Sequence, residues 1–448
     1  MFDSPFAKAR GTFYGWWMVI IGGLLMIITV VPVFQTTAVW AVALEHQFGW
    51  SRTQLGLALS FTRIEGSLTG PIAGYMVDRF GTRFMVFTGL LILTGGMFLF
   101  SQVQNLWMFY LAYFIMSIGQ GQGGWLPVMT MLNHWFIRRR GTAMGIAMTF
   151  MGVGGLILVP VIAWLVNPEE SGRLGWRWTV FILAIVSLAF AFVLPKFIRN
   201  RPEDYGDYPD GERPLAQPAP SPRTNAATGP ENGGPENSEP DNGEIELTVG
   251  EALRTQAFWC ISLGHGLGSM VVLGIMSHLG LMMQDVGFGL QTAAWILTIQ
   301  SAVSIVFQFL GGYLGDRVPK NLALFVFTAL QGVGVILLTV GDQIIYFYAF
   351  AVVFGIGFGG RTPLTTAIRG DYFGRASFGK ILGVSMVPMN VLLLIAAPMA
   401  GFMRDELGDY DLAFLTLGGL SILGAVLFLI ARRPKLPVRA PAVAAVYK

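Results

Sequence analysis

The chain has few charged residues for its length. Only 12% of its 448 residues are Asp, Glu, Lys or Arg, whereas soluble domains carry roughly 25%. Hydrophobic residues make up 54% of the chain, and the mean hydropathy is +0.60. A water-soluble fold could not bury so much apolar surface. The composition therefore excludes an ordinary soluble protein and predicts a chain whose solvent is largely lipid.

Several chemical motifs are also missing from the sequence. No Walker-type phosphate loop is visible, which argues against an ATP-driven pump. No clustered nucleophile and base stands out, so we do not expect an enzyme. We expect no metal site and no cofactor. The single cysteine, Cys260, cannot form an internal disulfide and says nothing about the redox compartment.

A cleavable signal peptide is not visible either. The first apolar run, residues 13–35, is too long for a signal core and has no small-residue cleavage site. We interpret this run as the first membrane helix.

Apolar segments long enough to cross a bilayer recur along the whole chain. A span needs roughly 20 mainly apolar residues, and only helices satisfy so many backbone groups in lipid without closing a barrel. The sequence therefore predicts an all-α membrane protein with twelve transmembrane helices, near residues 13–42, 53–78, 84–103, 106–133, 141–166, 178–197, 256–284, 289–315, 322–340, 344–369, 379–403 and 411–431.

One polar segment divides these helices into two sets of six. Residues 199–253 are rich in Pro, Gly, Asn and Glu, and such a composition cannot bury enough apolar area to fold. We predict four regions: an N-terminal six-helix bundle over residues 1–198, a disordered cytoplasmic linker over 199–253, a C-terminal bundle over 254–433, and a cytoplasmic tail over 434–448.

The basic residues predict the orientation. With the N-terminus in the cytoplasm, the termini and cytoplasmic loops hold 22 of the 29 Lys and Arg residues, and the opposite side holds four. The positive-inside rule then places both termini and the linker in the cytoplasm, in a multi-pass protein of the cell membrane. The same asymmetry accounts for the net charge of +3 without a nucleic-acid partner.

The two halves of the chain repeat each other. Residues 74–79, GYMVDR, recur 238 positions later as GYLGDR, residues 312–317. Residues 123–127, GGWLP, recur 236 positions later as GGRTP, residues 359–363, and Gly141 and Gly145 match Gly379 and Gly383. Internal repeats with a binding site between them are typical of secondary transporters.

The stretch GYMVDRFGTRF, residues 74–84, resembles the cytoplasmic signature of the major facilitator superfamily. The matching positions are Gly74, Asp78, Arg79, Gly81 and Arg83, and the second copy contributes Asp316 and Arg317. The second copy departs from the pattern, because Pro319 follows Val318 where a glycine is expected. The resemblance covers the whole chain and implies two pseudo-symmetric bundles, with these residues forming a gate. The alternative is that they only anchor the loop.

Two further segments resemble the monocarboxylate and oxalate/formate transporter branch of that superfamily. They are FYGWWMV, residues 13–19, and RPEDYGDYPDG, residues 201–211. That branch commonly carries a cation in its eighth helix, where this chain has Gln300 and Gln308. The resemblance implies a small organic anion as substrate, provided that another cation replaces the missing one.

Charged residues at lipid depth are costly and usually functional. Arg63 and Glu65 lie within the second predicted helix, on nearly opposite faces, so each needs a partner elsewhere. Arg361 lies in the tenth, where the repeat has Trp125, so the shared scaffold does not require this cation. We treat Arg361 and Arg63 as candidate substrate-binding residues, because a guanidinium fork matches a carboxylate. A structural ion pair or gate is the alternative.

Glu65, His265 and His278 are candidate proton carriers, since membrane carboxylates and histidines relay protons. The histidines are also candidates for simple packing roles. Polar groups near mid-membrane depth are candidates for binding a carboxylate or for joining helices: Gln120, Gln300, His265 and Asn390, with Gln35, Thr36, Thr37 and Gln122.

The leading hypothesis is alternating-access transport of a small organic anion by a monomer, driven by proton symport or anion exchange. Efflux of amphipathic compounds is a second transport hypothesis, and a non-transporting membrane sensor is a hypothesis from another class.

Overall fold

The computed structural model describes residues 13–167, 172–212 and 246–434, without the side chains of residues 52, 53, 56–68, 290 and 397. Helices make up most of these ranges, and no strand occurs in them. The N-terminal half contains α1 (Gly15–Val30), α2 (Thr37–Phe48), α3 (Arg52–Ser101), α4 (Leu106–Gly123), α5 (Trp125–Trp135), α6 (Arg140–Val166) and α7 (Gly175–Val193). The C-terminal half contains α8 (Val249–Leu253), α9 (Gln256–Asp285), α10 (Leu290–Gly315), α11 (Lys320–Ile336), α12 (Ile344–Phe373), α13 (Phe378–Leu407) and α14 (Asp411–Ile430).

These helices account for all twelve predicted spans. Ten stretches of the described residues are long and apolar enough to cross a membrane. The predicted span 53–78 is the first part of α3, which is interrupted at Gly81, and the predicted span 106–133 is α4 and α5, which Gly124 separates. A π-helix at Val31–Gln35 joins α1 to α2. The predicted all-α membrane fold is confirmed.

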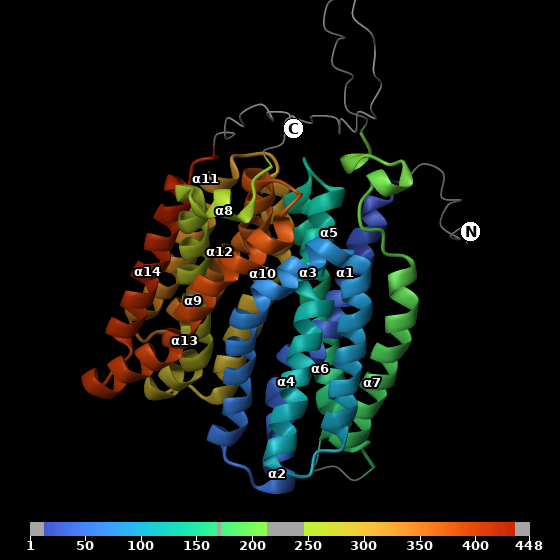
Figure 1. Ribbon diagram of the computed structural model, residues 1–448. Coiled ribbons are helices and arrows are strands. Elements are labelled where there is room, and N and C mark those ends of the chain that lie inside the picture. Colours follow the sequence, from blue (N-terminus) through green and yellow to red (C-terminus); the bar gives the residue numbers. More distant parts are fainter. Residues whose placement is uncertain (1–12, 168–171, 213–245, 435–448) are drawn as a thin grey trace, which may run out of the picture.

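The helices form two bundles, one from each half of the chain (Figure 1). The described chain begins and ends on the same face of the molecule, which we call the terminal face. The bundles approach each other closely at this face and lean apart toward the opposite face. Hydrophobic side chains of the described residues form three clusters. Two lie within the C-terminal bundle, and the third fills the N-terminal bundle and extends across the interface to Ala367 of α12 and to Phe378, Leu382 and Met386 of α13.

The predicted linker has ordered ends. At its start, Asp210 accepts hydrogen bonds from the backbone N–H groups of Ile137 (2.9 Å) and Arg138 (2.8 Å). At its end, Glu246 accepts them from the equivalent positions of the second half, Arg375 (3.0 Å) and Ala376 (2.8 Å). This differs from the expectation of disorder over 199–253, because polar segments that cannot form a core can still bind exposed loop amides. Residues 213–245 lie outside the described residues.

The two segments that suggested the transporter branch pack against each other. Tyr14 donates a hydrogen bond to the carbonyl oxygen of Phe197 (2.8 Å). The Arg199 guanidinium lies over the rings of Tyr14 (3.9 Å) and Tyr205 (4.4 Å), at cation–π distance. Both segments therefore serve to attach the start of the linker to α1.

Glycines allow the two bundles to touch at the terminal face. A Cβ atom at Gly74 of α3 would collide with the carbonyl oxygen of Gly379 on α13, and one at Gly312 of α10 would collide with that of Gly141 on α6. Contact of this kind brings helix backbones to a separation that no other residue permits. The two pairs occupy equivalent positions in the repeat, so the interface is pseudo-symmetric.

A carboxylate accompanies each glycine pair. Asp78 accepts hydrogen bonds from the backbone N–H groups of Gly379 and Lys380, both at 2.9 Å. Asp316 accepts them from Gly141 (2.9 Å) and Thr142 (2.7 Å).

These amides belong to the first turns of α13 and α6, where N–H groups have no partner within the helix and the helix dipole favours an anion. Neither helix has a side-chain cap from its own N-cap residue. Each bundle thus supplies the missing cap of a helix in the other.

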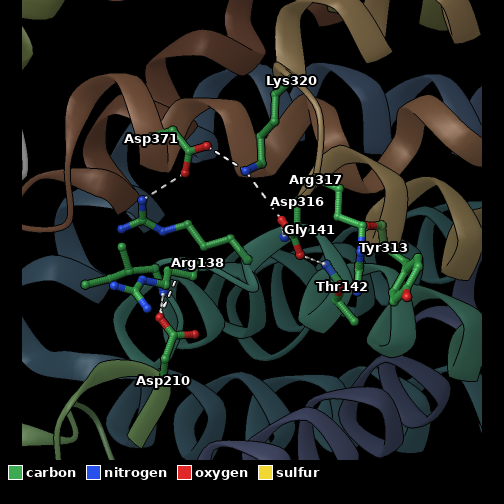
Figure 2. A network of polar contacts seen from close by, with 11 residues as sticks. Arg138, Gly141, Thr142, Asp210, Tyr313, Asp316, Arg317, Lys320 and Asp371 are labelled. Atoms are coloured by element: carbon green, nitrogen blue, oxygen red, sulfur yellow. Dashed lines mark hydrogen bonds and ion pairs between the residues drawn. The ribbon is translucent and has the colours of Figure 1, made fainter. Parts of the chain in front are cut away.

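Ion pairs reinforce one side of this interface (Figure 2). Asp371 of α12 pairs with Arg140 of α6 (3.0 Å) and with Lys320 (2.7 Å), which also approaches Asp316 at 3.4 Å. On the other side, Arg375 donates to Glu203 (2.7 Å) and to the carbonyl oxygen of His134 (3.3 Å). Charged groups from both halves therefore hold the terminal face closed.

The arginines of the signature do not cross the interface. Arg79 donates to the hydroxyl of Tyr75 on its own helix (2.7 Å), and Arg317, just beyond the end of α10, donates to the carbonyl oxygen of Tyr313 on that helix (3.1 Å). The Arg83 backbone N–H donates to Asn200. Gly81 has φ +80°, a value that favours glycine, and its position touches Asn200. The backbone conformation of the loop thus explains why residue 81 is a glycine. The contact between the bundles is made by the carboxylates of Asp78 and Asp316.

We expect the double variant Asp78→Asn/Asp316→Asn to open the terminal face more often. An amide oxygen accepts less strongly than a carboxylate, and a lost cap costs about 1–2 kcal/mol, which is a shift of roughly 5- to 30-fold in a two-state equilibrium. Spin labels can be attached at Trp107→Cys on α4 and Phe402→Cys on α13, near the opposite face, in a Cys260→Ser background. Double electron–electron resonance should then show a shorter distance between the two labels in the double variant than in the parent.

Glu406→Gln is the matched control, because Glu406 is an exposed carboxylate near the opposite end of α13. Its distance distribution should equal that of the parent. Unchanged distances in the Asp78→Asn/Asp316→Asn variant would show that the caps do not hold the terminal face closed.

Candidate functional site

A cavity lies between the two bundles. Its volume is about 350 Å³, within the usual range for small-molecule sites of about 300–1,000 Å³. Most of its lining belongs to the N-terminal bundle, and α13 contributes Met386 and Asn390 from the other side. The polar groups at its wall include Thr69, Ser117, Gln120, Gln122 and Asn390, and apolar side chains such as Phe34, Trp125 and Met151 complete it.

The structure places three of the predicted binding groups at this cavity, because Gln122 lines it together with Gln120 and Asn390. Gln120 is on α4 and Asn390 is on α13, so the pair draws on both halves of the chain. Amide groups donate and accept hydrogen bonds, and a small polar solute between them could contact both bundles at once. Two other predicted polar groups form hydrogen bonds within the N-terminal bundle. The Thr36 hydroxyl donates to the carbonyl oxygen of Pro32 (2.8 Å), and the Thr37 hydroxyl contacts the Tyr113 hydroxyl (3.1 Å).

Arg361 lies inside the C-terminal bundle and does not line this cavity. Its side chain is 2% exposed. Its Nε donates to Oε1 of Gln331 on α11 (2.5 Å), and Gln331 in turn donates to the carbonyl oxygen of Gly268 on α9 (2.8 Å). A Cβ atom at Gly268 would lie 3.0 Å from the guanidinium carbon. Three helices therefore enclose this cation.

Arg369 is a second buried cation on α12, and it is also enclosed by neutral groups. Its guanidinium donates to the Ser385 hydroxyl (2.9 Å), to the carbonyl oxygen of Thr365, and to Nδ1 of His265 (3.4 Å). Because arginine has no acceptor, His265 must accept at Nδ1 and carry its proton on Nε2. His265 is thus a neutral partner of Arg369 here.

Among the described residues, no carboxylate lies within ion-pair distance of Arg361 or Arg369. Arg369 does not pair with Asp371, which binds Arg140 and Lys320 instead. A buried charge without a counter-ion is expensive unless its hydrogen bonds are satisfied. The C-terminal bundle therefore carries excess positive charge close to α13, the helix that faces the cavity.

The remaining candidates lie elsewhere. Gln300 is 3% exposed and bonds to Ser304 on its own helix (2.9 Å), at the contact of α10 with α12. His278 contacts the hydroxyl of Tyr410 (3.2 Å), between α9 and the start of α14. The side chains of Arg63 and Glu65 are outside the described residues, so these two candidates stay predictions.

Sequence reasoning missed the groups that enclose the cations. Gln331 and Ser385 are polar residues inside predicted spans, and that placement was the available signal. Lys320 and Arg140 were counted only as cytoplasmic charges, although both take part in closing the terminal face.

We expect Gln331→Leu to destabilise the protein. The change removes the acceptor of a buried guanidinium and leaves a charged group unsatisfied, at a cost of about 2–3 kcal/mol. The melting temperature of the purified protein should fall by several degrees. Gln291→Leu makes the same chemical change at an exposed position of α10 and should leave the melting temperature unaltered. Equal melting temperatures for the two variants would show that the hydrogen bond from Arg361 to Gln331 does not stabilise the protein.

Comparisons with known proteins agree with this architecture. The chain is 25% identical over 417 residues to monocarboxylate transporter 13 of Rattus norvegicus. This alignment covers 92% of this chain and 88% of that protein. It is 24% identical over 428 residues to monocarboxylate transporter 12 of Xenopus laevis, covering 93% and 89%.

Solved structures show the same fold. The E. coli fucose:proton symporter FucP superposes with a TM-score of 0.70 at 13% identity, over 94% of this chain and all of that one. A structure of FucP in the outward conformation gives a TM-score of 0.71 at 15% identity, with the same coverage. The proton:xylose symporter XylE gives 0.67 at 14%, over 94% and 96%.

The family model described as Major Facilitator Superfamily matches residues 18–290 and 258–446, so that both halves of the chain are covered. The repeated bundles, the cavity between them and the glycine–carboxylate contacts at the terminal face are the structural counterpart of this match. The chain belongs to the Major Facilitator Superfamily, and it is a multi-pass membrane transporter rather than an enzyme.

Proposed function

We propose that the protein is a secondary active transporter of a small, monocarboxylate-like organic anion, working by alternating access. The observation that carries the proposal is the pair of buried arginines, Arg361 and Arg369, which are bonded to neutral groups among the described residues. The names of the relatives, monocarboxylate transporters 12 and 13, support the same substrate class over most of the chain.

The arginines act on the cavity electrostatically in this conformation. Ser385, which binds Arg369, and Asn390, which lines the cavity, are five residues apart on α13, about 7.5 Å along the helix axis. The same five residues turn the helix by about 140°, so Ser385 and Asn390 lie on nearly opposite faces of α13, and Arg369 is separated from the cavity by the width of that helix as well. At an effective dielectric constant of about 20, a unit charge at roughly 12–15 Å stabilises an anion by about 1 kcal/mol. Gln120 and Asn390 would then orient the carboxylate by hydrogen bonds.

The conformation supports alternating access. The bundles are joined at the terminal face by Asp78 and Asp316 and lean apart at the other face (Figure 1). The positive-inside rule assigns the terminal face to the cytoplasm of the cell membrane. With this orientation, we infer that the conformation is open to the outside of the cell. Opening to the cytoplasm requires both caps to break while α6 and α13 move apart from their partners.

Two coupling schemes fit this arrangement, proton symport and anion exchange. Protonation of His265 would turn its Nδ1 into a donor and break its bond to Arg369, freeing that guanidinium for another acceptor. Glu65 remains the other candidate carrier. The two pseudo-symmetric bundles enclose the cavity within a single chain, so we propose that the monomer is the working unit.

Efflux of amphipathic compounds is the second candidate function. Much of the cavity wall is apolar or aromatic, including Phe34, Trp125 and Met386. A cavity of this kind accommodates uncharged or amphipathic solutes. The two hypotheses differ in the charge of the solute, and that difference can be tested.

Substituting Asn390→Asp should abolish transport of a small carboxylate. A negative charge at the cavity wall repels an anionic solute and offsets the nearby arginines, so we expect initial rates to fall at least tenfold. Counterflow of radiolabelled pyruvate into proteoliposomes at neutral pH measures this effect. Asn390→Ser, which removes the amide without adding charge, should reduce the rate only a few fold.

Gln291→Glu adds the same charge at an exposed position of α10 and should keep the parental rate. Pyruvate counterflow by Asn390→Asp at the parental rate would contradict an anion site at this cavity. Counterflow restricted to uncharged amphipathic dyes would favour the efflux hypothesis.

A further inference from the structure

A second cavity lies at the outer surface of the N-terminal bundle, near the terminal face. Its volume is about 440 Å³, and it is formed by α3 just after Gly81 and by the end of α7. Phe87 and Phe192 lie about one helical turn farther from the terminal face than Arg83 and Lys196, so the cavity has a polar end near that face and an apolar end beyond it. The polar end holds Arg83, Lys196 and Asn200.

The apolar end of this cavity is aromatic. Phe84, Phe87 and Phe192 line it, and the rings of Phe87 and Phe192 are in edge contact at 5.8 Å. Phe84 and Phe192 are 45% and 54% exposed. On an outer surface of a membrane protein, such exposed aromatic rings face the acyl chains of the lipid.

The two cations at the polar end are available to a ligand. Arg83 and Lys196 are exposed, and within the described part of the chain neither side chain has an ion-pair partner. The backbone N–H of Arg83, not its guanidinium, donates a hydrogen bond to Oδ1 of Asn200 (3.0 Å). That bond leaves the Asn200 amide nitrogen as a further donor at the same end.

The cavity lies where an apolar span gives way to polar chain. The membrane-spanning stretch of α7 ends at Lys196, and the polar segment begins three residues later. The lipid headgroups occupy this depth, and basic pockets at this level bind anionic headgroups. A ligand with a phosphate at one end and hydrocarbon at the other matches both ends of the cavity.

We propose that this cavity binds one anionic phospholipid. The phosphate lies between Arg83 and Lys196, where a guanidinium and an ammonium donate charge-assisted hydrogen bonds to its oxygens. An acyl chain lies across the phenylalanine rings. Because Asn200 also holds the turn that follows Asp78, the lipid occupies a site adjoining the closed gate. The proposal requires only that the chain is embedded in a membrane and does not depend on the transported substrate.

Native mass spectrometry of the full chain tests this site. The purified protein is released from micelles that contain phosphatidylglycerol and phosphatidylcholine at equal mole fraction. We expect the parent to retain one phosphatidylglycerol and the Arg83→Gln/Lys196→Gln variant to retain at least tenfold less. Arg83→Lys/Lys196→Arg conserves both charges and should retain the lipid.

The matched control is Arg254→Gln/Arg432→Gln, which removes two exposed cations from the C-terminal bundle near the same face. It should bind phosphatidylglycerol like the parent. Should the first double variant fail to fold, Lys196→Gln alone carries the test, because its side chain is exposed.

Equal retention of phosphatidylcholine by the parent, or undiminished phosphatidylglycerol on the glutamine variant, would overturn the site. Glycerol 3-phosphate added at the concentration of the lipid should not displace it. Displacement by that soluble phosphate would show that the headgroup alone is recognised and would overturn the assignment to a lipid.

Discussion

The cap that each bundle supplies to a helix of the other is the constraint on which this structure depends. The first turns of α6 and α13 present backbone N–H groups that lack acceptors of their own, and Asp316 and Asp78 reach them across the interface. Only glycines at the contact, such as Gly74 and Gly312, let the backbones come close enough. Because these caps cluster at one face, the bundles can separate at the other face and leave a cavity between them.

The caps are suited to a reversible contact. When the bundles part, water replaces the carboxylates at the exposed amides, so the free-energy difference between the two states stays small. A buried ion pair would leave uncompensated charges on opening. The ion pair Arg140–Asp371 also crosses the interface near the terminal face, and there the arginine side chain is 2% exposed and the carboxylate 27%, so only the carboxylate meets solvent while this face is closed.

Positive charge is distributed unequally between the halves. Arg361 replaces the Trp125 of the repeat, and Gln331 and Gly268 make room for it and satisfy it. The N-terminal bundle contributes Gln120 and the aromatic rings of the cavity wall, and the C-terminal bundle contributes Asn390 and the two buried arginines. In the anion transport that we propose, this division lets a neutral cavity wall attract the solute without placing an exposed cation where a carboxylate would bind too tightly to leave.

Composition, apolar segments and internal repeats were sufficient to predict the twelve helices and their arrangement as two sets of six, because these features depend on hydropathy and on residue spacing along one chain. The resemblance to the superfamily signature singled out Asp78 and Asp316, whose role in gating stays a prediction. Contacts between helices far apart in sequence decide the partners of those carboxylates and the hydrogen bond of Arg361 to Gln331. They also decide that Gln120 and Asn390 line one cavity. A charged residue in an apolar helix indicates that a polar partner is needed, but the rotation of that helix relative to its neighbours decides which residue becomes the partner. Tertiary packing therefore placed Arg361 against α9 and α11 and Arg369 against α13, and neither side chain lines the cavity.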